Sequence, residues 1–265
     1  MDFLINLHPA IQALIACLIT WGVTALGASV VFLFKNVSKT ILDAMLGLSA
    51  GVMIAATFFS LLEPAITMAE NLKLIPWIVV SFGFFAGGLL LFIGDKIFDK
   101  KIEKLGKCKK DKIKRNIMLI FSITLHNIPE GMAIGVAFGS IPYNLEGATF
   151  MAAVLLTIGI AIQNFPEGSA VSLPLKRDGM SAKKAFLFGN FSGIVEPIAA
   201  VLGAILVLRV RILLPILLSF AGGAMIYVVV QELIPESQTN EKKDLMALFT
   251  ILGFIIMMIF DVALG

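Results

Sequence analysis

The sequence predicts an all-α integral membrane protein with eight transmembrane helices in one domain, residues 1–265. First, 58% of the residues are hydrophobic and 15% are charged, whereas about a quarter of the residues in a typical soluble domain are charged. Second, apolar segments of roughly 20 residues or more, the length that crosses a bilayer, recur along the chain. Third, the basic residues gather in alternate connections between these segments.

The first apolar segment, from Phe3 to Phe34, contains no Asp, Glu, Lys or Arg. No basic stretch of the kind that opens a signal peptide precedes it, so we expect this segment to be retained as the first span. Seven further apolar segments follow, and most connections between them are short. The eight predicted spans cover residues 9–34, 43–65, 75–95, 116–139, 147–173, 184–208, 212–235 and 245–264.

The long connection at about residues 96–115 carries ten of the 21 Lys and Arg residues and is too polar to enter lipid. With eight spans, the connections on its side of the membrane hold eighteen basic residues and those on the other side hold three. Because basic connections stay in the cytoplasm, both chain termini are predicted to lie outside. We therefore expect a multi-pass protein of the cell membrane (inner or plasma membrane), surrounded by the lipid bilayer.

A six-residue phrase that occurs twice is the strongest functional signal in the sequence. His126-Asn127-Ile128-Pro129-Glu130-Gly131 on the fourth span is echoed on the fifth span by Gln163-Asn164-Phe165-Pro166-Glu167-Gly168. Ionisable side chains inside a membrane are costly and occur where they bind or move something. The phrase therefore indicates a polar site within the membrane.

Each copy of the phrase places a glutamate directly after a proline. Residues three or four apart share a helix face, so His126 and Glu130 are expected to lie together. Pro129 and Pro166 cannot donate a backbone hydrogen bond, so we expect kinked helices with unpaired carbonyl oxygens. This mixture of nitrogen and oxygen ligands suits divalent cations such as zinc, iron, manganese or cadmium.

Further acids lie in the apolar spans, and no Lys or Arg lies in the middle of a span to neutralise them. Glu196 is beside Pro197 in the sixth span, and Glu232 lies late in the seventh span, where an interfacial charge explains it equally well. Isolated carboxylates in a medium of low dielectric constant would take up protons, and a bound divalent cation is the alternative.

Several of these candidate ligands also have simpler interpretations. Asn127, Gln163 and Asn164 could form hydrogen bonds between helices, and Glu196 could be a protonated structural acid. Met53 on the second span could supply a thioether ligand. By spacing alone it is a packing residue, because twelve methionines are scattered along the chain.

A second echo indicates an inverted repeat. Ala50-Gly51-Val52-Met53-Ile54 on the second span resembles Gly222-Gly223-Ala224-Met225-Ile226 on the seventh, and a proline follows each at a similar distance. The two copies of each motif lie on spans that run in opposite directions. This arrangement is typical of secondary transporters.

These motifs resemble the ZIP family of divalent metal transporters, most closely its GufA-like branch. The resemblance covers roughly residues 43–265 and rests on segments 43–47, 125–135, 161–168 and 192–197. It implies eight helices in a 3+2+3 arrangement, outward termini and a transport site on the fourth and fifth spans. It is also compatible with a homodimer.

The resemblance further implies a centre for one or two metal ions, bridged by Glu130 and Glu167. The first ion would also contact Met53, His126 and Gln163, and the second would contact Asn127, Asn164 and Glu196. Some relatives have His in place of Gln163 and Asp in place of Asn164. We therefore expect weaker binding in this chain, most of all at the second position, and one His without Cys is a modest ligand set for zinc.

The sequence thus predicts a permease that moves a divalent transition-metal cation toward the cytoplasm by rocking one helix bundle against another. The cation is the transported substrate, and we expect no prosthetic group, nucleic-acid partner or enzymatic activity. Two alternatives stay open. An intramembrane metalloenzyme would need a metal-bound water and a general base, and the chain has no H-E-x-x-H motif. A proton-driven transporter of another solute would use the acids as a relay.

Overall fold

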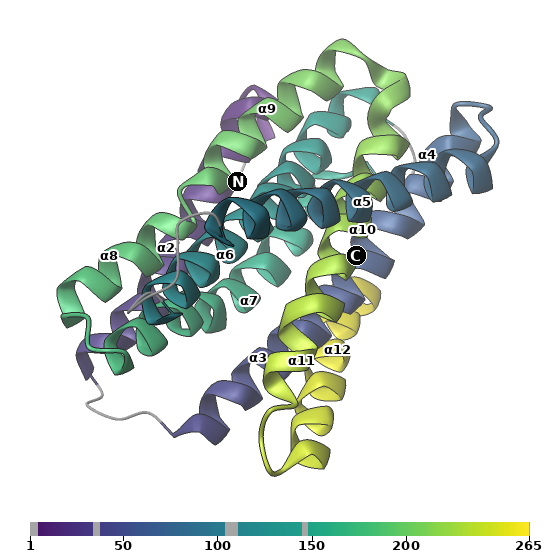
Figure 1. The fold of residues 1–265 in the computed structure, drawn as a ribbon. Coiled ribbons are helices and arrows are strands. Elements are labelled where there is room, and N and C mark those ends of the chain that lie inside the picture. Colours follow the sequence, from purple (N-terminus) through teal and green to yellow (C-terminus); the bar gives the residue numbers. More distant parts are fainter. Residues whose placement is uncertain (1–4, 34–37, 104–110, 145–147, 265) are drawn as a thin grey trace.

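The computed structural model describes residues 5–33, 38–103, 111–144 and 148–264, and long helices dominate it (Figure 1). The helices are α2 (Pro9–Leu33), α3 (Lys39–Ala56), α4 (Glu63–Asn71), α5 (Pro76–Glu103), α6 (Asp111–Ser140), α7 (Phe150–Arg177), α8 (Ala182–Ser192), α9 (Val195–Arg209), α10 (Leu214–Val228), α11 (Ile234–Ser237) and α12 (Lys243–Leu264). Two π-helical segments, η1 (Thr57–Leu62) and η4 (Val229–Leu233), and two short 3₁₀ segments, η2 (Ile141–Tyr143) and η3 (Arg211–Leu213), connect some of them.

Each predicted span coincides with one helix or with a run of consecutive helices. Seven helical runs in the described part of the chain are long and apolar enough to cross a membrane, which makes this a multi-pass membrane protein. The other predicted span, residues 116–139, lies within the 30-residue helix α6. Most side chains in the first half of α6 lie outside the described part.

The Lys-rich connection predicted at 96–115 is shorter than its composition suggests. Helix α5 continues to Glu103 and α6 begins at Asp111, so residues 104–110, which are outside the described part, separate them. Lys and Glu are good helix formers, and a helix pairs its own backbone groups in water as well as in lipid. Both helices can therefore extend past the apolar segments that define the spans.

Two of the long runs contain a π-helical segment shortly before a proline. Segment η1 precedes Pro64, and η4 precedes Pro235. Proline lacks the N–H that would close the preceding turn, and a wider π-helical turn accommodates the missing bond. The two breaks follow the two echo motifs of the second and seventh predicted spans at similar distances.

The helices pack as two bundles. In the first bundle α2 packs against α7 and α6 packs against α9, with α8 alongside; in the second, α3 packs against α12 and α5 against α10. Contacts of α3 with α7 and of α10 with α6 join the bundles. Figure 1 shows α2, α8 and α9 on one side of the molecule and α3, α11 and α12 on the other.

The glycines that end the repeated phrase hold the first bundle together. A Cβ atom at Gly131 would overlap the backbone of α9 at Glu196, and one at Gly168 would overlap the backbone of α2 at Thr24. Small residues let membrane helices approach this closely. This close contact places each copy of the phrase directly against a second helix of its bundle.

Candidate metal site

Helices α6 and α7 carry the two copies of the repeated phrase and are α-helical through Pro129 and Pro166. Neither proline divides its helix, in contrast to Pro64 and Pro235, which follow π-helical segments. The two copies therefore present their polar residues from uninterrupted helices that pack against each other in the first bundle.

The predicted ligands are buried wherever their side chains are described. Each of these side chains is at most 5% exposed: Met53, Asn127, Glu130, Gln163, Asn164, Glu167 and Glu196. His126 lies on α6 one turn before Glu130, and its side chain is outside the described part. These described side chains are therefore withdrawn from the protein surface.

Glu130 links the two copies of the phrase. Its Oε1 accepts a 2.5 Å hydrogen bond from Nε2 of Gln163 on α7. Glu130 Oε2 and Gln163 Oε1 are buried and have no hydrogen-bond partner among the described residues. One oxygen of each side chain is therefore available to a ligand between α6 and α7.

Glu167 faces the second bundle. The Ser49 hydroxyl of α3 lies 3.4 Å from Glu167 Oε1 and 3.3 Å from the carbonyl oxygen of Gln163, both weak hydrogen bonds. Glu167 Oε2 is without a partner in the described part of the chain. Met53 is one turn beyond Ser49 on α3 and shares its helix face. Met53 therefore lies on the face of α3 that also carries Ser49, the residue in contact with Glu167.

Glu196 has a different environment. Residues Gly193 and Ile194 separate α8 from α9, so Glu196 lies in the first turn of α9 although it is in the middle of a predicted span. Its Oε2 accepts a 2.6 Å hydrogen bond from the Thr20 hydroxyl of α2. Nδ2 of Asn164 lies 2.9 Å from Oε1 and 3.1 Å from Oε2. Both oxygens of this carboxylate therefore have protein donors.

The two asparagines of the phrase also donate hydrogen bonds through their amide nitrogens. Asn127 Nδ2 donates to the carbonyl oxygen of Ser192 at 2.8 Å, and Asn164 donates to Glu196. Their Oδ1 atoms are buried without a partner among the residues described. The interhelical hydrogen bonds of the simpler interpretation are present for both residues, and each Oδ1 has no donor among the described residues.

Five buried amide and carboxylate oxygen atoms on α6 and α7 thus lack hydrogen-bond donors among the described residues: Asn127 Oδ1, Glu130 Oε2, Gln163 Oε1, Asn164 Oδ1 and Glu167 Oε2. An unpaired buried acceptor costs roughly 1–3 kcal/mol, so a cation that contacts several of them would be stabilised. Among the described side chains, no three His, Cys, Asp or Glu residues are close enough together to form a metal-binding group. The donor set is therefore two carboxylates with amide oxygens around them.

Sequence reasoning missed Ser49 and Thr20, which contact Glu167 and Glu196 from neighbouring helices. Serine and threonine are common in membrane helices and often bond to their own backbone, as the Thr20 hydroxyl also does with Cys17 O at 3.1 Å. Their position therefore carries no signal until the partner helix is known.

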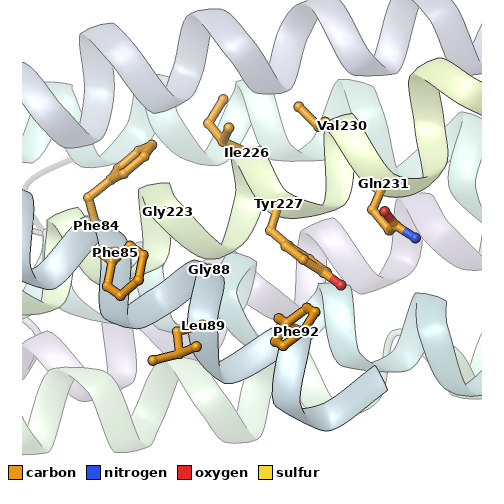
Figure 2. Close-up of a pocket in the computed structure, with 10 residues that line it drawn as sticks. All are labelled: Phe84, Phe85, Gly88, Leu89, Phe92, Gly223, Ile226, Tyr227, Val230 and Gln231. Atoms are coloured by element: carbon orange, nitrogen blue, oxygen red, sulfur yellow. The ribbon is translucent and has the colours of Figure 1, made fainter. Parts of the chain in front are cut away.

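A cavity of about 520 Å³ lies between α5 and α10, and Figure 2 shows the side chains that line it. Aromatic side chains line it, among them Phe85, Phe92 and Tyr227, and none of the predicted ligands does. Phe85 is 69% exposed, so the cavity opens on the outer face of the second bundle. Its apolar lining does not suit a cation.

Comparisons with known proteins identify the family of this chain. A family model described as ZIP Zinc transporter matches residues 101–261. The chain is 38% identical to Zinc transporter ZIP11 from Xenopus tropicalis, covering 97% of this chain and 98% of the relative. It is 36% identical to Zinc transporter ZIP11 from Homo sapiens, with 96% and 97% covered. It is 32% identical to Zinc transporter GufA from Myxococcus xanthus, with 95% and 98% covered. The chain therefore belongs to the ZIP zinc transporter family.

Proposed function

We propose that this protein carries zinc across the cell membrane toward the cytoplasm, with iron, manganese and cadmium as further candidate substrates. Its relatives are named zinc transporters, which supports vectorial movement of a metal ion over enzymatic turnover. The observation that carries the proposal is the set of five buried amide and carboxylate oxygen atoms on α6 and α7 without donors in the described part of the chain. Such atoms are expected where a cation enters and leaves.

The proposed architecture has eight spans, including α6, in a 3+2+3 arrangement with outward termini. An inverted repeat that relates the first three spans to the last three would exchange α2 with α9, α3 with α10, and α5 with α12. The same repeat would exchange α6 with α7. The counterpart of the α2–α7 contact would then be the α9–α6 contact, and the counterpart of the α5–α10 contact would be the α12–α3 contact. All four contacts are present, and the π-helical segments before Pro64 and Pro235 fall on the related pair α3 and α10.

The transported ion would be bound near the middle of the membrane by Glu130 and Glu167, with Met53, His126 and Gln163 around it. Gln163 holds one Glu130 oxygen through its Nε2 atom and keeps its own Oε1 available. Asn127, Asn164 and Glu196 lie beside this position and are the residues that a second ion would use.

The proposed transport step uses the boundary between the bundles. Glu130, Gln163 and Glu167 belong to the first bundle, whereas Met53 and Ser49 on α3 belong to the second. Rocking one bundle against the other would change this ligand set and open the site toward alternate sides. The outward apolar faces, such as that of Trp77 and Phe82 on α5, are available to lipid or to a second copy in a homodimer.

The test is zinc uptake into proteoliposomes that contain the purified protein. The Glu130→Ala variant is expected to lose uptake, because it removes an oxygen ligand and leaves Nε2 of Gln163 without its hydrogen-bond acceptor. The matched control is Glu70→Ala, which changes an exposed glutamate on α4 and should transport normally. Full transport by Glu130→Ala would contradict the site, and solute transport without any metal dependence would favour a proton-driven carrier.

A further inference from the structure

We infer that Glu196 is a hydrogen-bonded clamp between helices in this chain, and that the protein carries one divalent cation at a time. The inference rests on the proposed function, and it assigns Glu196, Asn164 and Thr20 to the support of the site instead of to a second ion. Among glutamates 130, 167, 196 and 232, Glu130 and Glu167 alone bind the cation.

The carboxylate of Glu196 already has the donors that a cation would otherwise replace. Thr20 donates at 2.6 Å to one oxygen, and Asn164 Nδ2 lies within 3.1 Å of both. The first turn of α9 adds the positive end of a helix dipole, which favours a negative charge there. Glu196 is fully buried and has none of the unpaired oxygens found on Glu130 and Glu167.

Asn164 turns its donor group toward the carboxylate that a second ion would need. Its amide nitrogen faces both oxygens of Glu196, and an amide N–H group is a donor that repels a cation. An aspartate at position 164 would instead face Glu196 with like charge, and a cation between the two carboxylates would relieve this repulsion. The asparagine therefore substitutes for the second cation.

The position of the clamp within the fold explains what it does. Thr20, Asn164 and Glu196 lie on α2, α7 and α9, which all belong to the first bundle. Glu167, by contrast, is next to Ser49 of the second bundle. The clamp can therefore keep three helices together as one body while the ligand set at the bundle boundary changes.

The test is the number of zinc ions bound per chain, measured by calorimetry and elemental analysis on the purified wild-type protein and its variants. We expect one ion for the wild type and one for Glu196→Gln, with an affinity change of less than about tenfold, the smallest loss typical of residues that support a metal ligand. Asn164→Asp is expected to raise the number to two. Glu130→Gln should abolish binding.

Two ions on the wild type, with one on Glu196→Gln, would overturn the inference. One ion that is lost in Glu196→Gln would also overturn it, provided that the variant keeps the wild-type melting temperature. If Glu196→Gln does not fold, the number of zinc ions bound to Thr20→Val is measured instead. This variant weakens the clamp and should still bind one ion. If neither the wild type nor any variant binds zinc, or if Glu130→Gln binds zinc as the wild type does, the result would instead contradict the proposed function.

Discussion

Both the Glu130–Glu167 side of the site and the Glu196 side contain buried carboxylates, but the two sides differ in how completely these carboxylates are hydrogen-bonded. Glu130 and Glu167 each leave one buried oxygen without a donor among the described residues, and Glu167 has only a 3.4 Å contact with Ser49. Glu196 receives short hydrogen bonds at both oxygens. A buried carboxylate is thus a candidate ligand only where the protein leaves it incompletely paired.

The largest expected effect that separates the two sides comes from replacing each glutamate with glutamine. Glu167→Gln should weaken zinc binding by at least about 100-fold, the upper range for losses at groups that only support a ligand. Glu196→Gln should retain uptake, because glutamine keeps an oxygen acceptor for Thr20. Zinc titration and proteoliposome uptake measure both variants. Equal losses in the two variants would erase the distinction.

The second effect is on packing beneath Glu196. A methyl group at Gly131 would overlap the α9 backbone at Glu196, so Gly131→Ala should destabilise the protein by about 1–3 kcal/mol, typical of overpacking. Gly22→Ala is the matched control, because nothing lies within 4 Å of the added atom on α2. Thermal unfolding in detergent compares them. A normal melting temperature for Gly131→Ala would mean that the α6–α9 contact is looser than described.

The third effect tests the clamp by itself. Thr20→Val keeps the shape of the side chain and removes the donor to Glu196, so we expect a loss of roughly 1–1.5 kcal/mol in stability. Zinc affinity should change little, and Thr20→Ser, which keeps the hydroxyl, should restore stability. Thermal unfolding and zinc titration on the same samples separate the two properties. A loss of zinc affinity without a loss of stability would show that Thr20 acts on the ion.

The sequence predicts the helical spans well because apolar length is a local property. It does not predict how helices end or break. Pro64 and Pro235 follow π-helical segments whereas Pro129 and Pro166 lie within α-helices, and this difference depends on packing against neighbouring helices. The doubled phrase marks the site because carboxylates in apolar spans are costly wherever they lie.

The roles within the site depend on pairs that are distant in the chain. Thr20 and Glu196 are separated by 176 positions, and Ser49 and Glu167 by 118. A hydroxyl on one span gives no indication of which acid it will meet on another. The sequence therefore identifies Glu130, Glu167 and Glu196 as a group, and only their partners distinguish a candidate ligand from a clamp.

The smallest expected effect concerns the contact across the bundle boundary. Ser49 lies 3.4 Å from Glu167 Oε1, so Ser49→Ala should cost about 0.5 kcal/mol, the low end for a hydrogen bond. This corresponds to roughly a twofold change in zinc affinity or uptake. The control is Ser29→Ala, which removes an exposed hydroxyl on α2 that donates to the carbonyl oxygen of Leu26. A loss as large as that of Glu167→Gln would make Ser49 a ligand, and the second bundle would then hold the ion directly.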